Sequence, residues 1–300
     1  MSDVGTSVQR MRFGFVMPFG DARAIADAAV LAESSGWDAV FVWEPVWGVD
    51  AWVSLTAAAM VTESIRLGTM LTPLPRVKPW DLASRAATLD RLSGGRVQLA
   101  VGLGAVHPGW TAFEADEGRA RRVELLDEGL AVYDGLMRGQ PFSYDGRHHH
   151  VTPTDFFVPD PPVQQPRVPV WVVGAYRPDR NKQPSVERAA HWDGVIPYWI
   201  DTDHPGPVSN AAVGEDGPAR LAEIVDRARS AREATGLPWH GYDVVHEGRS
   251  HGSDPTIPPN PSVWAQAGAT WWMEGAWDLD RTSAGRAELV RRITAGPPRA

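Results

Sequence analysis

The stretch that decides the fold runs from Ile65 to Gly104 and reads IRLGTMLTPLPRVKPWDLASRAATLDRLSGGRVQLAVGLG. Its two ends, Ile65–Leu71 and Val97–Val101, are short apolar runs that predict strands, and the apolar spacing over Leu82–Leu92 predicts a helix between them. The strands are largely apolar and do not alternate with polar residues, which is typical of parallel strands buried on both faces. The stretch therefore predicts a strand–helix–strand unit with a parallel pair of strands.

The same alternation continues on both sides of this unit. Further strands are predicted at Arg12–Pro18, Ala39–Trp43, Val170–Val173, Gly194–Pro197, Tyr242–His246 and Thr270–Met273. Further helices are predicted at Asp21–Ser35, Ala51–Thr62, Glu114–Arg138, Ser185–Ala190, Ala219–Thr235, Pro261–Ala267 and Thr282–Thr294. Eight such units in a chain of 300 residues predict an α/β fold, the (β/α)8 TIM barrel. The alternative, an open doubly wound sheet, would favour a G-x-G-x-x-G turn after the first strand, which Met17–Asp21 lacks.

The expected domain organisation is simple. We expect residues 1–10 to be a disordered lead and residues 11–300 to form a single barrel domain. Residues 139–168 are rich in Pro, Gly and His and are predicted to be an excursion after the strand-four helix that carries a small hairpin. Residues 201–218 are predicted to be a loop.

Composition excludes several classes of function. The formal net charge is −8, and no basic stripe is present, which argues against nucleic acid as a partner. No apolar run is long enough to cross a bilayer, and the first residues lack the apolar core of a signal peptide. The chain has no cysteine, so disulfides and thiolate chemistry are excluded. A cytoplasmic location is the default expectation.

The carboxyl ends of the predicted strands are where a barrel of this kind places its active site. They carry mostly aromatic residues, glycine and methionine and few carboxylates, which favours a flat conjugated ligand over metal ions. The run His148-His149-His150 lies in the excursion and is interpreted as a loop or hairpin edge, not as a metal site. A small apolar or aromatic organic substrate is expected, and the predicted substrate pocket consists of Phe19, Trp47, Trp199 and Trp271.

Two short segments point to a ligand near the backbone. Gly102 and Gly104 follow the fourth strand and allow a ligand to approach the main chain closely. Gly174-Ala175-Tyr176-Arg177 follows the fifth predicted strand and precedes a helix, so it offers backbone N–H groups and a guanidinium to a phosphate.

The motifs of the opening stretch resemble those of the bacterial luciferase-like monooxygenase family. They are LGTMLTPLP at 67–75, Lys78-Pro79-Trp80, ATLDRLSGGR at 87–96 and VGLG at 101–104. Among them the ten-residue motif is quite specific. Further matches are Arg122 with Leu125, Leu126 and Glu128, then Val173-Gly174, then Asp193-Gly194.

This resemblance implies a flavin-dependent oxidoreductase that uses reduced FMN or coenzyme F420 for monooxygenation with O₂ or for hydride transfer. It also implies the barrel with its insertion, a non-prolyl cis peptide at Met70–Leu71 under the ring, and phosphate contacts at Arg122 and residues 174–177. The expected cofactor-binding residues are Trp43, Met70, Leu71, Gly102, Gly104, Arg122, Gly174, Ala175, Tyr176 and Arg177. Besides the small-molecule substrate, the candidate partners are a second copy in a homodimer and, with FMN, a flavin reductase.

One departure from the family pattern affects the chemistry. After the second strand the family commonly has an acidic residue followed by a histidine, whereas this chain has Glu44-Pro45. Because proline cannot exchange a proton, Glu44 or His107 is predicted to be catalytic instead. The departure mildly favours simple redox chemistry, or a proton supplied by the substrate or by water.

Alternatives remain open at this point. A catalytically silent flavin-binding relative and a metal-dependent barrel hydrolase are the competing hypotheses. FMN and F420 are equally compatible with the motifs, although Arg177, Arg180 and Lys182 form a small basic patch suited to the acidic tail of F420.

Overall fold

A computed structural model describes residues 10–200, 216–250 and 260–298 of the protein. The predicted lead up to residue 9 and most of the predicted loop at 201–218 lie outside the described residues. None of the described helices is both long and apolar enough to cross a membrane. The cytoplasmic location stays a prediction.

The main sheet has the strand order of the predicted barrel. Its members are β1 (Arg12–Met17), β2 (Ala39–Val42), β3 (Arg66–Thr69), β4 (Thr72–Pro73), β5 (Val97–Gly102), β8 (Val170–Tyr176), β9 (Gly194–Trp199), β10 (Asp243–Gly248) and β11 (Trp271–Gly275). Their order is β3-β2-β1-β11-β10-β9-β8-β5-β4, and β3 also pairs with β5, so the order returns on itself. The fold is therefore the (β/α)8 barrel, as predicted.

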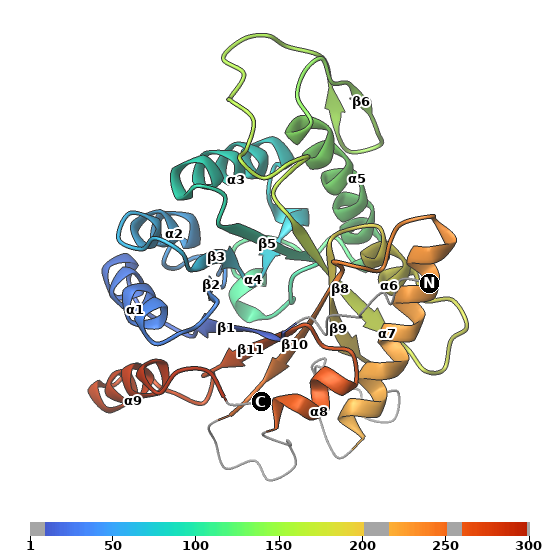
Figure 1. The fold of residues 1–300 in the computed structure, drawn as a ribbon. Helices are drawn as coiled ribbons and strands as arrows, with labels where there is room; N and C mark the ends of the chain where they lie inside the picture. The colour runs from blue at the N-terminus through green and yellow to red at the C-terminus, as the bar shows by residue number, and fades with distance from the viewer. Residues whose placement is uncertain (1–9, 201–215, 251–259, 299–300) are drawn as a thin grey trace, which may run out of the picture. The chain divides into compact units, whose positions relative to one another are not determined.

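Contacts divide the chain into two compact units. The larger unit comprises Phe15–Val173 and Gly275–Pro297. It contains α1 (Ala22–Ser34), α2 (Ala51–Ala59), η1 (Leu74–Arg76), α3 (Pro79–Ser93), α4 (Pro108–Thr111), α5 (Arg119–Met137) and α9 (Ser283–Thr294). Figure 1 shows α1, α2 and α3 following one another along β1, β2 and β3.

Local sequence signals set the ends of these helices. The Asp21 carboxylate accepts a hydrogen bond of 2.9 Å from the Ala24 N–H and caps α1, as predicted. Gly94 ends α3 in the left-handed region, with φ 70°. The predicted helix over 114–138 is wrong at its start, because α5 begins only at Arg119, after Gly118 with φ 89°.

Tight packing between strands fixes the register in this unit. Leu67 lies opposite Val97 and Gly68 opposite Gln98 in the parallel β3–β5 pair. A Cβ atom at position 68 would lie 2.3 Å from the Gln98 carbonyl oxygen, so only glycine allows this approach. Phe41 and Trp171 stack in the core with ring centroids 5.5 Å apart.

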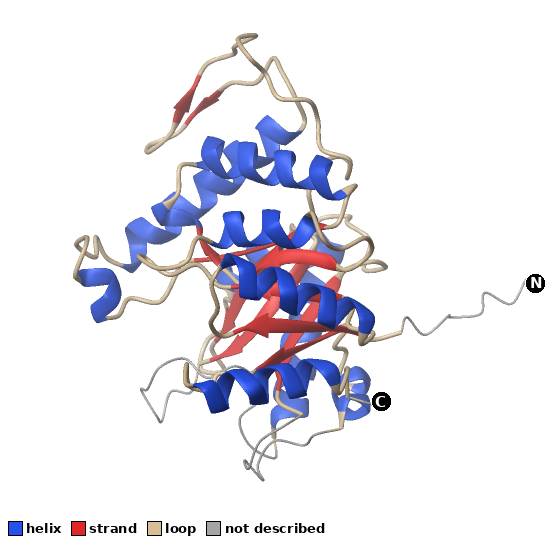
Figure 2. Ribbon diagram, turned by 90° about the vertical axis from the view of Figure 1, so that its left-hand side faces the viewer, coloured by secondary structure: helices blue, strands red, loops and turns tan. Residues whose placement is uncertain are grey.

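The excursion carries the predicted hairpin. β6 (Tyr144–Asp145) and β7 (His150–Val151) pair antiparallel as a separate small sheet, which Figure 2 shows at the top of the view. Three backbone N–H groups at 147–149 donate to the Glu128 carboxylate on α5, at 2.8–2.9 Å. The Glu128 carboxylate therefore holds the backbone of the hairpin turn against α5.

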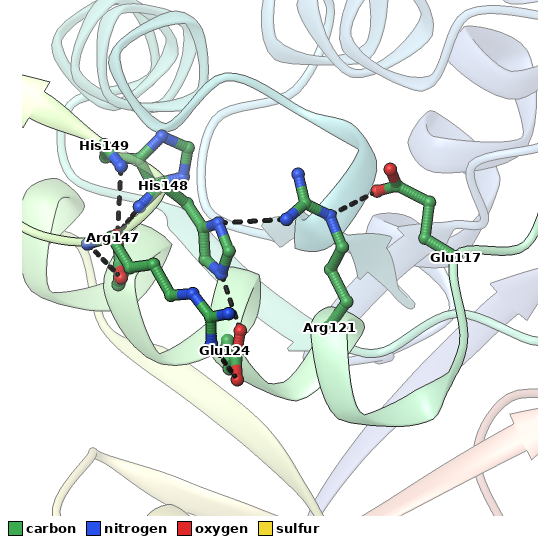
Figure 3. Close-up of polar contacts among 7 residues, drawn as sticks. Glu117, Arg121, Glu124, Arg147, His148 and His149 are labelled. Atoms are coloured by element: carbon green, nitrogen blue, oxygen red, sulfur yellow. Dashed lines mark hydrogen bonds and ion pairs between the residues drawn. The ribbon is translucent and has the colours of Figure 1, made fainter.

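A second set of contacts explains the histidine run. His148 Nε2 lies 2.7 Å from Glu124 Oε2 and its Nδ1 lies 3.2 Å from Arg121 Nη1 (Figure 3). Arg147 also donates to Glu124, at 3.0 Å. Within the described residues no three metal-ligating side chains come together. His148 thus packs the hairpin against α5, in agreement with the interpretation of this run as a hairpin edge.

The smaller unit comprises residues up to Gly14, Gly174–Glu274 and the last three residues. It contains α6 (Pro184–Ala190), α7 (Gly217–Ala234) and α8 (Pro261–Gln266), with β10 parallel to both β9 and β11. Its core holds the completely buried Trp264, Trp271 and Trp272. The His246 ring stacks on Trp264 with centroids 3.7 Å apart, and burial lowers the pKa of His246 to about 3.

Candidate active site

A cavity of about 500 Å³ lies at the carboxyl ends of β1 and β2, within the larger unit. A volume of this size is typical of small-molecule sites. It is lined by Met17, Pro18, Phe19, Gly20, Asp21, Ile25, Val42, Trp43, Pro45, Trp47, Gly48, Val49, Arg281 and Arg286. The structure therefore brings together three predicted site residues, Phe19, Trp43 and Trp47.

The aromatic walls of this cavity differ in how firmly they are held. Trp43 donates its indole N–H to the Pro18 carbonyl at 3.2 Å and packs edge-on against Trp277. Trp47 is 82% exposed and lies 6.1 Å from the Phe113 ring. The cavity thus has one fixed indole wall and one indole at its rim.

The end of β3 carries the backbone feature that the family resemblance predicted. The Met70–Leu71 peptide is cis, as expected. Thr69 and Thr72 flank it, and their hydroxyl oxygens lie 2.9 Å apart. Met70 and Leu71 are both half-buried, so their side chains remain open to a ligand.

Glu44 is joined to this segment through its side chain. Its Oε1 accepts hydrogen bonds from the Thr72 hydroxyl at 2.7 Å and from the Trp52 indole N–H at 2.9 Å. No partner contacts Oε2 among the described residues. Desolvation by burial raises the pKa of Glu44, and it outweighs the two hydrogen bonds, which act in the opposite direction. Glu44 therefore has one oxygen fixed and one oxygen at which a proton is held more tightly than usual.

A cluster of donors follows β5. Arg122 donates to the Gly104 carbonyl at 3.3 Å and to Asp116 at 3.1 Å. The guanidinium carbons of Arg122 and Arg76 lie 5.9 and 4.9 Å from the Trp110 ring centroid. The indole N–H of Trp110 is buried and has no acceptor in the described part of the chain. This cluster suits an anionic group, which would supply the acceptor that Trp110 lacks.

Gly104 is required for this arrangement. Its φ is +73°, and a Cβ atom there would lie 2.5 Å from the Trp110 ring. At Gly102 a Cβ atom would lie 2.9 Å from Val173 and 3.3 Å from Leu71. The two predicted glycines therefore let the chain pass closely beside Trp110 and Leu71.

His107 occupies a structural position. Its ring is exposed, and its Nδ1 accepts the Gly109 N–H at 3.0 Å. Its carbonyl accepts from the Trp110 N–H at 2.8 Å, at the start of the short helix α4. These contacts are typical of a helix cap, so the structure gives less support to His107 than to Glu44 as a proton carrier.

Residues 174–177 differ from their predicted form. Gly174, Ala175 and Tyr176 belong to β8, which is longer than predicted, and do not form a turn. The Ala175 N–H donates to Ser185 Oγ, and the Arg177 N–H donates to Gln183 Oε1. The Arg177 guanidinium pairs with Asp179 at 3.0 Å. Two N–H groups that were expected to face a phosphate are therefore already satisfied by side chains.

The remaining predicted pocket residues lie in the smaller unit. Trp199, at the carboxyl end of β9, packs 5.2 Å from the Tyr176 ring and beneath the Arg220 guanidinium. Trp271 is the first residue of β11, at the opposite end of the strand from an active-site face. It is 0% exposed and its ring is covered by Arg12, at 4.4 Å. The rim position predicted for Trp271 does not agree with this placement.

Sequence reasoning missed several residues of the site. Arg281 and Arg286 reach the cavity from the segment after β11, and Thr72 and Trp52 hold Glu44. The only signal for Thr72 was its place directly after the Met70–Leu71 pair. Nothing in the spacing of Arg281 and Arg286 marks them among 27 arginines.

Comparison with known proteins gives one family for the chain. A family model described as luciferase-like monooxygenase matches residues 5–189. An uncharacterised protein of Mycobacterium tuberculosis is 33% identical over 317 residues, which cover 95% of this chain and 98% of the relative.

Solved structures agree with the fold. The coenzyme F420-dependent tetrahydromethanopterin reductase from Methanopyrus kandleri has a TM-score of 0.69 at 17% identity, over 94% of this chain and 97% of that protein. The oxygenating constituent of 3,6-diketocamphane monooxygenase from Pseudomonas putida, in complex with FMN, has a TM-score of 0.61 at 18% identity, over 80% and 67% of the two chains.

Proposed function

The chain belongs to the luciferase-like monooxygenase family, and from this premise we propose that it is an oxidoreductase using reduced FMN or coenzyme F420 on a small apolar or aromatic substrate. The observation that carries the proposal is the aromatic cavity at the ends of β1 and β2, formed by Phe19, Trp43 and Trp47. A flavin or deazaflavin, when bound, supplies the electrons for hydride transfer or oxygen activation. The structural relatives whose names include F420 or FMN support this choice of cofactor.

Residues of the larger unit fit such a cofactor. The cluster of Arg122, Arg76 and Trp110 has an unsatisfied indole N–H and two guanidinium groups. These guanidinium groups pair with Asp116 and Glu114, and an anionic group would share them with these carboxylates. Gly102 leaves room beside Leu71 that a Cβ atom would fill. We assign the phosphate end to this cluster and the ring to the surface of Met70 and Leu71.

The residues of β8 have a smaller part in this proposal. The N–H groups of Ala175 and Arg177 already have acceptors, so we assign no phosphate contact to them. Gly174 and Tyr176 remain predicted cofactor contacts. The Arg177 side chain would have to leave Asp179 to bind the tail of F420.

Glu44 is the residue that we propose as proton carrier in place of the missing histidine. Thr72 and Trp52 orient the carboxylate through Oε1, which leaves Oε2 to hold the proton. Because burial raises its pKa, Glu44 holds this proton at a higher pH than a solvated carboxyl would. Pro45 beside it lines the cavity and contributes only an apolar surface.

Turnover with defined cofactors tests the proposal. The reoxidation of reduced F420 is followed with a panel of aromatic aldehydes, ketones and enones, and O₂ consumption is followed with reduced FMN. We expect the protein to accelerate one of the two reactions. Tight binding of a cofactor without acceleration of either reaction would instead identify a catalytically silent relative, the alternative suggested by the Glu44-Pro45 pair.

A further inference from the structure

We propose that the cavity at the ends of β1 and β2 recognises a substrate that combines a planar aromatic ring with a carboxylate, and that Arg281 and Arg286 bind the carboxylate. This inference rests on the proposed function and adds the substrate class to it. Its starting point is that two arginines line a cavity whose other walls are mostly apolar and aromatic.

Both arginines are available to a ligand. Each is exposed, and neither lies within ion-pair distance of a carboxylate in the described ranges 10–200, 216–250 and 260–298. The Arg286 Nε donates to the Arg281 carbonyl at 3.2 Å, which holds the two residues together. The Arg286 guanidinium carbon lies 5.9 Å from the centroid of the Phe19 ring. A guanidinium beside an aromatic face is suited to a ligand with both a carboxylate and a ring.

The nearby acidic residues accept hydrogen bonds from the chain beside them. Asp21 lines the cavity, and its carboxylate accepts the Ala24 N–H at the start of α1. Asp280 precedes the arginines, and its carboxylate accepts the N–H and the hydroxyl of Thr282, which lower its pKa. A third acid, Asp27, lines a neighbouring pocket together with Arg286. None of the three acids lies within ion-pair distance of Arg281 or Arg286 in the described part of the chain. The cavity lining therefore carries two positive charges and the single negative charge of Asp21.

Arg281 and Arg286 lie at a different part of the sheet edge from the donor cluster around Arg122. The cavity is at β1 and β2, whereas Gly104 and Arg122 follow β5, and β3 lies between β2 and β5 in the strand order. The cis Met70–Leu71 segment at the end of β3 therefore lies between the two cationic groups. We assign the anionic group of the cofactor to the cluster around Arg122, and the carboxylate of the substrate to Arg281 and Arg286.

Ligand-observed NMR titrations without cofactor test the inference, with benzoate and its neutral analogue benzyl alcohol as probes. We expect benzoate to bind the protein about tenfold more tightly than benzyl alcohol, and the double variant Arg281→Gln/Arg286→Gln to lose this preference. The control variant Arg23→Gln removes an exposed arginine of α1 that does not line the cavity, and it should keep the preference. Equal binding of the two probes by the wild-type protein, or an undiminished preference in the double variant, would overturn the inference.

Titration of FMN and F420 into the same proteins shows whether Arg281 and Arg286 bind the carboxylate of a substrate or the anionic tail of the cofactor. We expect the double variant to bind the cofactor as tightly as the wild-type protein does. A parallel loss of cofactor affinity would assign Arg281 and Arg286 to the cofactor tail and refute the substrate class. If the wild-type protein binds neither cofactor, the proposed function fails, whereas the benzoate titration still decides whether the cavity recognises an aromatic carboxylate.

Discussion

Arg122 links helix α5 to the turn after β5, and its guanidinium is the group that we expect to meet the phosphate of the cofactor. It holds the Gly104 carbonyl and Asp116, and its side chain is 13% exposed. A guanidinium held in this way is oriented before a ligand arrives, so less side-chain entropy is lost on binding.

Replacing this side chain should weaken cofactor binding. Arg122→Gln removes a charge-assisted hydrogen bond, and we expect the dissociation constant of the bound cofactor to rise about 10- to 100-fold. The neighbouring Arg121→Gln is a matched control, because Arg121 lies on the same helix but contacts Glu117 and His148. Fluorescence titration measures both variants, and equal effects of the two substitutions would argue against the assignment.

Glu44 is the residue that we propose as the proton carrier. Burial raises the pKa of its carboxyl, so the folded protein holds the proton more tightly than the unfolded chain does. The stability that comes from this proton is fully present below the ordinary value of 4.5 and is lost as the pH rises through the pKa of the folded state.

The variant Glu44→Gln should reveal this linkage. Glutamine keeps an oxygen for Thr72 and Trp52 but does not titrate. The free energy of unfolding of the wild-type protein, relative to that of the variant, should therefore fall as the pH rises above 4.5. Urea unfolding at several pH values measures the difference, with the exposed Glu63→Gln as the control. A difference that stays constant or grows with pH would contradict the raised pKa.

At the scale of secondary-structure elements, two carboxylates of helix α5 hold the β6–β7 hairpin against this helix. Glu128 takes three backbone N–H groups, and Glu124 takes the side chains of Arg147 and His148 (Figure 3). Desolvation raises the pKa of Glu128, but the backbone donors outweigh it, and the pKa is lower than that of a free glutamate. The contact therefore stabilises the hairpin above about pH 4.5 and weakens as the pH falls below that value.

Loss of the Glu128 carboxylate should release the hairpin. Glu128→Ala leaves the N–H groups of residues 147–149 without their acceptor, so their hydrogen exchange should become faster. Glu124→Gln keeps these backbone hydrogen bonds and should change the exchange of the same amides much less. Exchange measured by mass spectrometry on peptides covering 144–151 distinguishes the two, and unchanged exchange in Glu128→Ala would refute this role.

At the element scale the sequence was informative wherever a local signal existed. Asp21 marked the start of α1, and the Pro, Gly and His content marked the hairpin excursion. The sequence-based prediction was wrong at the start of α5, which follows a left-handed glycine at 118, and at the end of β8, which pairing with neighbouring strands extends. These are tertiary effects, which apolar spacing does not report.

For the whole molecule, the alternation of strands and helices was enough to predict the barrel, and the aromatic cavity lies at the carboxyl ends of its strands β1 and β2. The family motifs added the cis peptide at Met70–Leu71. The cavity itself could not be predicted in full. Arg281 and Arg286 lie more than 230 residues from Trp47 in the chain, and only the closing order of the strands brings them together.

The central claim is that the carboxyl ends of these strands bind a reduced flavin or deazaflavin. Equilibrium titration of the purified protein with reduced FMN and, separately, with reduced F420 tests it most directly. We predict saturable binding of one of the two at a single site, with an affinity that Arg122→Gln lowers and Arg121→Gln leaves unchanged. Absence of saturable binding of both cofactors to the folded protein would contradict the account.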